Sequence, residues 1–342
     1  MAIKTLIVGF GYAAQTFHLP FLRCLNAFNV DAVVSSDAAK VNAILPECRV
    51  YGALDDAIHA QHFDLIIVTT PNLMHGHQAR KALEANSHVL VEKPFVLSVT
   101  EANELVALAE SRQLKLCAFH NRRFDGDFIT VCRLLASNKL GDVKHIVSRF
   151  DRFRPQPKNR WRENADAGSG IFWDLGPHLI DQAVALLGKP QKISGYLHTQ
   201  RENGQSTDNF ELTLHYPDLN YHVGSSCFQA NETLRFEVRG TQGSYRQFGL
   251  DSQEDQLKNG ISPSAGTFGL GAREGELCSQ NGCETVTLES GRYIQFYKQL
   301  AYAIDGGQPP PISTHDMLAS VEILAGVVAV AEANEGHVLI TS

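Results

Sequence analysis

A short apolar strand that runs directly into a glycine-rich turn constrains the fold of this chain more than any other feature. The strand covers residues 5–8, and the turn Gly9-Phe10-Gly11-Tyr12-Ala13-Ala14 has the pattern G-x-G-x-x-A. Gly9 allows the tight turn, Gly11 lets a pyrophosphate approach the backbone, and Ala14 keeps the next helix close to the strand. The N–H groups at the start of that helix suit phosphate oxygens. The stretch predicts a dinucleotide site; an ordinary strand–helix turn is the alternative.

Strand-like and helix-like segments alternate after this turn. We expect strands at residues 30–35, 64–70, 88–91 and 114–119, and helices at 79–85 and 101–111. Continuous apolar runs such as 64–70 are typical of parallel strands that are buried on both faces. Alternating strands and helices indicate a doubly wound sheet. The fold class is therefore α/β, with a Rossmann dinucleotide-binding domain over residues 1–122.

The pattern changes in residues 123–342, where strands alternate apolar and polar residues. Residues 210–216 and 234–239 show this alternation, with Arg235, Glu237 and Arg239 as the polar set of the second strand. Such strands are typical of an antiparallel sheet that is covered on one side. We read 250–283, rich in Gly, Ser, Asn and charge, as a loop or excursion, followed by helices over 292–304 and from Ser313. The second domain is therefore predicted to be α+β.

Composition excludes several classes of function. The chain has 342 residues, enough for about two domains, and a formal charge of −7 that argues against a nucleic-acid surface. No Lys/Arg run suggests a membrane patch, and no apolar run reaches spanning length. The seven cysteines form no C-x-x-C pair and no metal spacing, so we expect no metal and a cytoplasmic protein with reduced, mostly buried thiols. They are Cys24, Cys48, Cys117, Cys132, Cys227, Cys278 and Cys283.

The residues after the second strand bear on which dinucleotide binds. An acid near this position usually binds the ribose hydroxyls of NAD. Here the strand ends in Ser35-Ser36-Asp37, with Lys40 nearby. The serines leave room for a 2′-phosphate, which Ser36 could bond and Lys40 could partly neutralise. This favours NADP over NAD, unless Asp37 turns inward instead of capping the next helix.

Two stretches carry candidate reacting groups. Glu92-Lys93-Pro94 directly follows a buried strand, at the edge where open α/β sheets bind ligands. Burial beside a cofactor would lower the pKa of Lys93 and make it a partner in proton transfer. The alternative is a surface lysine that ends a strand.

The second stretch is Trp173-Asp174-Leu175-Gly176-Pro177-His178-Leu179-Ile180-Asp181. Asp174, His178 and Asp181 share one helical face. We place Pro177 in the first helical turn and Asp174 near the N-cap, with Gly188 and Pro190 ending the helix. A histidine beside a carboxylate can act as an acid or base near neutral pH. The alternative is a capping aspartate with a structural histidine.

These motifs occur together with Thr70-Pro71-Asn72 and His75, and the combination resembles the Gfo/Idh/MocA family, the glucose–fructose oxidoreductase and inositol dehydrogenase group. The resemblance implies a Rossmann domain followed by a domain with a large, mostly antiparallel open sheet. Its free face would serve for a homodimer or homotetramer. It also implies hydride transfer between NAD(P) and a carbon of a sugar or cyclitol. The family's catalytic lysine, aspartate and histidine fall on Lys93, Asp174 and His178, and its Lys–Pro peptide is often cis.

Three further stretches, 119–125, 149–155 and 159–162, look like the family branch that contains NADP-dependent scyllo-inositol dehydrogenases. The resemblance assigns substrate contacts to His120, Arg154, Trp161 and Arg162; for the arginines, inter-domain or subunit ion pairs are the alternative. The expected cofactor-binding residues are Gly9, Gly11, Tyr12, Ala13, Ala14, Ser35, Ser36, Lys40, Thr70, Pro71, Asn72, His75, Glu92, Lys93 and Asn121.

We therefore expect an NAD(P)-dependent dehydrogenase acting on a secondary alcohol of a cyclitol or sugar. His178 would take the hydroxyl proton, Asp174 would support His178, and Lys93 would hold the substrate oxygen. Two alternatives stay open because a fold does not settle function: a sensor of ligands or dinucleotides, and a glycosidase that recycles bound NAD.

Overall fold

The computed structural model describes residues 2–341, except for the side chain of Trp161. It divides into two compact units. The first consists of Met1–Asn121, Gln253–Phe268 and Arg292–Val321, and the second of Arg122–Ser252, Gly269–Gly291 and Glu322–Ser342. Segments from the last third of the chain thus belong to the unit that contains the glycine turn. Among the described residues, no helix is long and apolar enough to cross a membrane.

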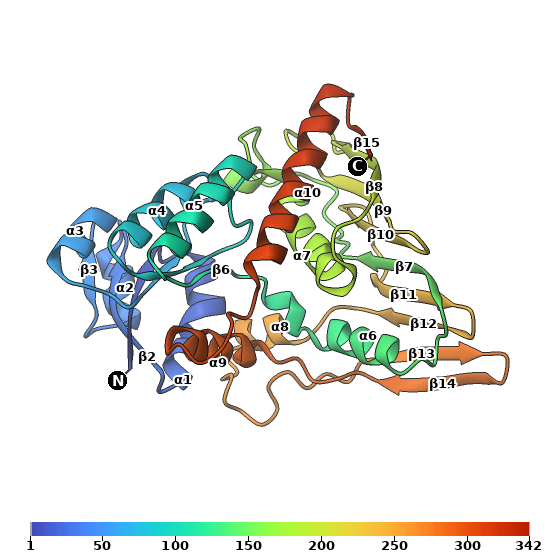
Figure 1. The fold of residues 1–342 in the computed structure, drawn as a ribbon, viewed down its shortest axis with the longest axis horizontal. Helices are drawn as coiled ribbons and strands as arrows, with labels where there is room; N and C mark the ends of the chain where they lie inside the picture. Colours follow the sequence, from blue (N-terminus) through green and yellow to red (C-terminus); the bar gives the residue numbers. More distant parts are fainter. Residues whose placement is uncertain (1, 342) are drawn as a thin grey trace. The chain divides into compact units, whose positions relative to one another are not determined.

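The first unit contains a six-stranded parallel sheet in the order β3-β2-β1-β4-β5-β6. This is the strand order of the dinucleotide-binding Rossmann fold, and the prediction of that fold is confirmed. Figure 1 labels β2, β3 and β6 of this sheet. Its strands are β1 (Ile3–Val8), β2 (Phe28–Val34), β3 (Arg49–Tyr51), β4 (Leu65–Val68), β5 (His88–Val91) and β6 (Leu116–Ala118). All four residues of β4 are buried, as expected for a strand covered on both faces.

Helices surround this sheet. They are α1 (Leu19–Cys24), α2 (Ala38–Ile44), α3 (Leu54–Ala60), α4 (His75–Glu84), α5 (Val99–Ser111), α8 (Gln253–Lys258), α9 (Tyr293–Ile304) and the first part of α10 (Thr314–Ala333). The apolar periodicity of α5 and α9 is borne out, because Leu105 and Phe296 lie on fully buried faces. The expected cap of the last helix is also present, since the Asp316 N–H donates to Ser313 Oγ at 3.1 Å.

The second unit is built on a nine-stranded sheet in the order β14-β13-β12-β11-β7-β10-β9-β8-β15. The pairs are antiparallel except for the parallel pair β7–β10, which confirms the predicted mostly antiparallel sheet. Its strands are β7 (Val143–Arg149), β8 (Lys192–His198), β9 (Asn209–His215), β10 (Asn220–Ser226), β11 (Leu234–Gly240), β12 (Gly243–Phe248), β13 (Glu274–Ser279), β14 (Gly282–Thr287) and β15 (His337–Thr341).

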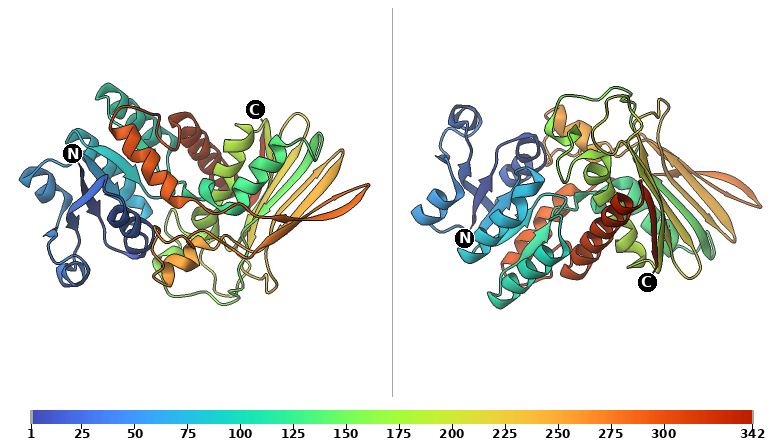
Figure 2. Two further views of the ribbon diagram at one scale, coloured as in Figure 1. Left: turned by 90° about the horizontal axis from the view of Figure 1, so that it is seen from below. Right: turned by 90° about the horizontal axis from the view of Figure 1, so that it is seen from above.

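Helices α6 (Gly126–Ala136) and α7 (Gly170–Leu187) pack on one face of this sheet (Figure 2). Cross-strand register places Val147, His222, Thr213, Ser194 and Leu339 in one row on the opposite face. These side chains are half-buried or exposed, whereas Ile146 and Tyr221 in the neighbouring register are buried. The sheet therefore has one covered face and one open face, as the alternating sequence predicts.

Helix α7 corrects one prediction about local structure. It begins at Gly170, after an N-cap at Ser169, so Pro177 lies inside the helix rather than in its first turn, and Asp174 is not near the N-cap. The positive φ of Gly170, +91°, sets the turn into the helix. The predicted end is confirmed, because Gly188 forms the C-cap with a φ of +72°.

The interpretation of 250–283 as a loop or excursion is wrong in part, because this stretch contains α8 and strand β13, which forms a hairpin with β14. The hairpin places Cys278 directly opposite Cys283, and the two form a disulfide. The expectation of seven reduced thiols therefore fails for this pair. The other five are thiols, of which only Cys117 and Cys227 are buried.

A bulge in β11 turns Arg235 from the predicted polar face into the core. The register shifts between Leu234 and Phe236, and Arg235 is 1% exposed. Its guanidinium donates to Asp127 at 3.1 Å, Ser148 at 2.7 Å and Gln182 at 2.8 Å. Burying a charge is costly unless such partners surround it.

Replacing Arg235 with methionine is expected to lower the free energy of unfolding by about 3–5 kcal/mol, because Asp127 would stay buried without its counter-charge. Urea denaturation measures this loss. The double variant Arg235→Met/Asp127→Asn should recover part of it. Lys139→Gln is the control: it breaks the ion pair with Glu284, in which both side chains are exposed, for about 1 kcal/mol or less. Equal losses in Arg235→Met and Lys139→Gln would contradict the assignment.

Candidate active site

The predicted cofactor-binding residues of the first unit gather at one edge of its sheet. Strands β1, β2, β4, β5 and β6 are parallel, and their carboxyl ends are followed by Gly9, Ser35, Thr69, Glu92 and Phe119. The strand order reverses between β1 and β4. This is the position at which open α/β sheets bind dinucleotides. The structure therefore brings the separate sequence motifs to one edge.

The glycine turn has the geometry that a pyrophosphate requires. Gly9 has a φ of +92°, and a Cβ there would lie about 3.0 Å from Thr69 Oγ1, so this position requires glycine. A Cβ on Gly11 would meet no atom within 4 Å, which leaves open space above the backbone. Tyr12 and Ala13 begin the helical segment that continues through the π-helical turn η1 (Ala14–His18). The chain thus fits a bound NAD(P) at this turn.

The residues after β2 show which role Asp37 has in the structure. Asp37 is the N-cap of α2, and its carboxylate accepts a hydrogen bond from the Lys40 N–H at 2.9 Å. The Asp37 N–H donates to Ser35 Oγ at 3.1 Å. Ser36 and Lys40 are exposed. The interpretation of Asp37 as a helix cap is therefore confirmed.

His75 connects the loops that follow β4 and β5. Its Nδ1 lies 2.8 Å from the Pro94 carbonyl oxygen, and its Nε2 lies 2.9 Å from that of Thr70. Burial lowers the pKa of His75, and the two carbonyl hydrogen bonds oppose this shift only in part. The fully buried ring thus lies between the backbones of both loops, and in its neutral form it donates its one N–H to one of the two carbonyls. Pro71 is exposed and Asn72 begins the short 3-10 helix η2 (Asn72–Met74).

Glu92 has a buried partner that sequence reasoning missed. His18 Nε2 lies 3.0 Å from Glu92 Oε1, and the Lys93 N–H donates to Glu92 Oε2 at 3.0 Å. The Tyr297 hydroxyl lies 3.1 Å from His18 Nδ1. Burial raises the pKa of Glu92, but the hydrogen bond and charge of His18 bring the net pKa below its usual value. The sequence feature that could have indicated this partner is His18, a histidine in the helical segment that follows the glycine turn.

Lys93 follows β5 at the same edge and is half-buried, and its peptide bond to Pro94 is cis, as the resemblance implied. His120 and Asn121 follow β6 and are 2% and 4% exposed. All three belong to the first unit, whereas Arg154, Trp161, Arg162, Asp174 and His178 belong to the second.

In the second unit, helix α7 carries Asp174, His178 and Asp181. The Asp174 carboxylate contacts Arg152 at 3.1 Å and Arg162 at 3.7 Å. The Asp181 carboxylate accepts two hydrogen bonds from the Arg123 guanidinium, at 2.8 and 2.7 Å. This bidentate pair anchors the part of the helix that follows His178. His178 is 6% exposed, one helical turn after Asp174.

The arginines near Asp174 form a pocket that sequence reasoning described only in part. Arg154 and Arg162 were predicted to contact substrate, and both line it with Asp174. Arg152, Arg160 and Arg201 also line this pocket and were not among the predicted site residues. The alternating sequences Arg152-Phe153-Arg154 and Arg160-Trp161-Arg162 were the available signal. The side chain of Trp161 lies outside the described residues.

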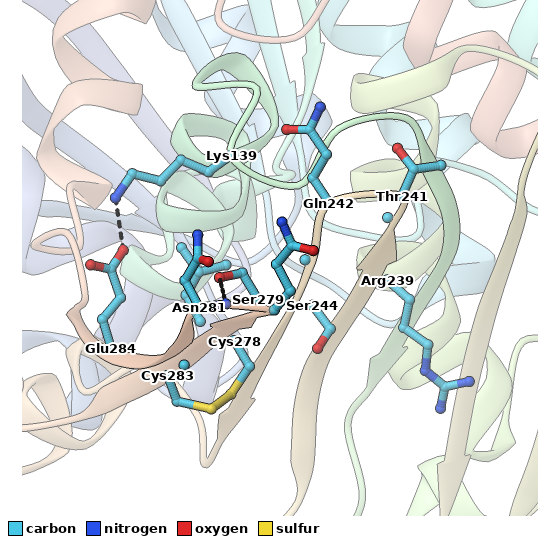
Figure 3. A pocket seen from close by; sticks show the side chains of 15 residues that line it. Lys139, Arg239, Thr241, Gln242, Ser244, Cys278, Ser279, Asn281, Cys283 and Glu284 are labelled. Atoms are coloured by element: carbon cyan, nitrogen blue, oxygen red, sulfur yellow. Dashed lines mark hydrogen bonds and ion pairs between the residues drawn. A yellow bond between two sulfur atoms is a disulfide. The ribbon is translucent and has the colours of Figure 1, made fainter.

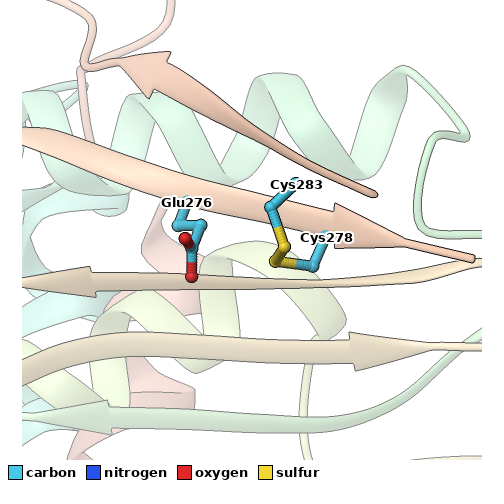
Figure 4. A group of neighbouring side chains, drawn as sticks. All are labelled: Glu276, Cys278 and Cys283. Carbon is cyan, nitrogen blue, oxygen red and sulfur yellow. A yellow bond between two sulfur atoms is a disulfide. The ribbon is translucent and has the colours of Figure 1, made fainter. Parts of the chain in front are cut away.

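A larger hollow of about 920 Å³ lies in the second unit between the β11–β12 and β13–β14 turns (Figure 3). None of the predicted site residues lines it, and its polar groups include the Lys139–Glu284 ion pair at 2.7 Å. Beside it, ligand-type atoms of Glu276, Cys278 and Cys283 lie within 4.8 Å of one another (Figure 4). The two sulfurs are bonded to each other, so neither is available as a thiolate.

Comparisons with known proteins agree with this geometry. Residues 3–120 match the family model described as "Oxidoreductase family, NAD-binding Rossmann fold", and residues 128–246 match the "GFO/IDH/MocA C-terminal domain". The chain is 39% identical to the Escherichia coli oxidoreductase YdgJ over 94% of each chain. It is 31% identical to the Bacillus subtilis scyllo-inositol 2-dehydrogenase (NADP(+)) IolW, over 94% of this chain and 92% of that one.

Among solved structures, the Yersinia pestis protein YPO2259 superposes with a TM-score of 0.93 at 37% identity. The match covers 100% of this chain and 98% of that one. The glycine turn, the strand order and these matches over nearly the whole length lead to one conclusion. The chain belongs to the Gfo/Idh/MocA family of NAD(P)-binding oxidoreductases.

Proposed function

We propose that this protein transfers a hydride between NADP and a secondary alcohol or ketone of a cyclitol or sugar. The observation that carries the proposal is the open glycine turn at the β1–β4 switch point, in a chain that keeps Lys93, Asp174 and His178. When bound, the nicotinamide takes up or supplies the hydride. The relative named for scyllo-inositol and NADP supports the substrate class.

We assign the proton chemistry to three side chains. His178 takes the proton of the substrate hydroxyl, because a neutral imidazole is a competent base near neutral pH. Asp174 supports the charge that His178 gains. Lys93 donates a hydrogen bond to the same substrate oxygen and holds it while the proton moves. The remaining predicted residues position the cofactor and the polyol.

The choice of NADP rests on the residues after β2. Asp37 is already used as a helix cap, so its carboxylate is not aimed at a ribose, and exposed Ser36 and Lys40 are available for a 2′-phosphate. A phosphate gains most from a cationic partner.

Ser36→Asp is expected to weaken NADP binding about ten- to hundredfold, because a carboxylate would replace a hydrogen bond to a doubly charged phosphate with repulsion. NAD binding should stay the same or improve. Titration of nicotinamide fluorescence with both reduced cofactors measures the ratio, with Ser111→Asp on α5 as control. An unchanged ratio of NADP to NAD affinity would show that the 2′-phosphate of NADP does not bind beside Ser36.

The substrate class is tested by following reduced-nicotinamide absorbance across inositols and aldoses with NAD and with NADP. Reduction of NADP by one cyclitol or sugar supports the dehydrogenase. Tight cofactor binding without turnover would favour a sensor, and cleavage of a glycoside without net cofactor change would favour a recycling glycosidase.

We also propose that the open sheet face joins copies of this chain into a homodimer or homotetramer in the cytoplasm. Its row of half-buried and exposed side chains, including Thr213 and Leu339, supports the assembly. The five cysteines outside the hairpin are thiols, which suits a reducing compartment; the disulfide does not.

Thr213→Arg is expected to reduce the sedimenting mass to that of a monomer, because it places a charge in the centre of the proposed interface. Glu110→Arg on α5 is the control and should leave the mass unchanged. A wild-type protein that sediments as a monomer would overturn this proposal.

A further inference from the structure

The pocket beside Asp174 carries more positive charge than its own carboxylates balance. Its charged lining consists of five arginines and two acids: Arg152, Arg154, Arg160, Arg162, Arg201, Glu163 and Asp174. The lining therefore has a net charge of +3. Arg201 is 7% exposed, so part of this charge is removed from water. Like charges that lie close together and are partly buried repel one another, and a counter-charge is required to offset this repulsion.

The acids of the pocket are already engaged. Glu163 accepts hydrogen bonds from Arg160 at 2.6 Å and from Arg201 at 2.9 Å. Asp174 contacts Arg152 at 3.1 Å and Arg162 at 3.7 Å. Within these described residues, four guanidinium groups thus share two carboxylates. Arg201 also contacts a third acid, Asp208, at 3.0 Å.

Among the described residues, no carboxylate lies at ion-pair distance from the guanidinium of Arg154. Its backbone N–H donates to the Cys227 carbonyl, and its backbone carbonyl accepts a hydrogen bond from the Arg201 guanidinium. These two bonds fix the position of the Arg154 backbone. Burial lowers the pKa of Arg154, and the charges of Arg152 and Arg160 lower it further; the charge of Asp174 opposes this shift only in part. A planar guanidinium in such a setting matches the two oxygens of a carboxylate or phosphate.

The pocket is fitted to a terminal group. Its free volume of about 20 Å³ is on the scale of one to two ordered waters, so it admits the oxygens of a terminal oxyanion but not a sugar ring. Gly170 and Ile171 also line it, and the positive end of the α7 dipole adds to the field. Asp174, assigned above to the chemistry, lines the same pocket.

We propose that the substrate carries an oxyanion, a carboxylate or a phosphate, which binds in this arginine pocket while an alcohol or ketone of the same molecule reacts. This inference rests on the proposed function and narrows it to acidic sugars or phosphorylated polyols. A neutral cyclitol, such as the substrate in the name of the Bacillus subtilis relative, leaves Arg154 without a counter-charge.

The test compares matched neutral and anionic ligands by calorimetry in the presence of NADP. D-glucuronate against D-glucose probes the carboxylate, and myo-inositol monophosphate against myo-inositol probes the phosphate. We expect at least one anionic ligand to bind tenfold or more tightly than its neutral partner. Arg154→Gln should weaken only that ligand, by about ten- to hundredfold, since a hydrogen bond between charged groups is lost.

Arg154→Lys keeps the positive charge but lacks the planar set of N–H donors of a guanidinium, so it should recover part of the affinity that Arg154→Gln loses. Arg133→Gln on α6 is the control: it changes another partly exposed arginine of the same unit and should leave both ligands unaffected. Unfolding midpoints of all variants show whether each is folded.

The outcomes separate this inference from the proposed function. Equal binding of both members in each pair, or equal weakening of both by Arg154→Gln, overturns the arginine pocket as an anion site. Turnover of neutral polyols in that case leaves the dehydrogenase standing. Selective anion binding that Arg154→Gln abolishes, without turnover of any polyol, supports the pocket and counts against the dehydrogenase.

Discussion

Lys93→Met is expected to lower kcat by about a hundred- to ten-thousandfold, because a positioned proton-transfer group contributes rate factors of that size. Cofactor affinity should change little, since the glycine turn that fits the pyrophosphate is separate from the Lys93 side chain. Lys93 follows β5 at the carboxyl edge of the parallel sheet, directly after Glu92, whose carboxylate is held by His18 and the Lys93 N–H. The lysine backbone is therefore fixed.

Steady-state turnover and titration with reduced nicotinamide measure the two effects separately. Lys115→Met is the matched control, because Lys115 precedes β6 at the opposite edge of the same sheet. It should retain both turnover and binding. Wild-type turnover in Lys93→Met, with intact cofactor binding, would remove Lys93 from the reaction.

His178→Asn is expected to have an effect of similar size, about a hundred- to ten-thousandfold in kcat, because asparagine cannot accept the substrate proton. The limb of the pH–rate profile that reports loss of the base should also disappear. His178 lies one turn after Asp174 in α7. The Asp181–Arg123 pair anchors the part of α7 that follows His178, so this helix should stay folded in the variant.

A matched histidine variant, His315→Asn, changes a side chain that is 74% exposed and should leave kcat and its pH profile unchanged. A purely structural role for His178 predicts a different result: a lower unfolding midpoint with an unchanged profile. That outcome would reassign the proton to another group.

Local rules of the sequence were sufficient for several elements of the first unit. The glycine turn predicts its own φ, since only glycine tolerates +92° so close to Thr69. The strand at 88–91 has the bounds that its apolar run predicts, because a strand buried on both faces has no polar interruptions. Asp37 was recognisable as a cap because its position precedes a helix.

The second unit depended on contacts that no local pattern encodes. The hairpin β13–β14 has polar, glycine-containing strands at the sheet edge, so periodicity did not reveal it, and the Cys278–Cys283 pairing was missed with it. Arg235 enters the core because a bulge shifts the register of β11. Helix α7 begins at Gly170 because the backbone N–H of Ile171 bonds to the Thr207 carbonyl, far along the chain. The arginine pocket likewise joins residues from 152 to 227.

The candidate site shows the same division. Sequence motifs predicted a single edge because each motif ends a parallel strand, and the structure brings the ends of these strands together at one edge. The partners of those motifs, such as His18 for Glu92 and Arg152 for Asp174, come from other segments and needed the structure.

Hydride transfer itself is the central claim, and deuterium tracing tests it most directly. NADPH deuterated at the transferable nicotinamide position is incubated with keto-cyclitols and keto-sugars, neutral and anionic, and the alcohol is analysed by mass spectrometry. The account predicts one deuterium on the new carbinol carbon, formed at least about a hundredfold more slowly with Lys93→Met. No deuterated alcohol from any ketone, despite bound cofactor, would contradict the account.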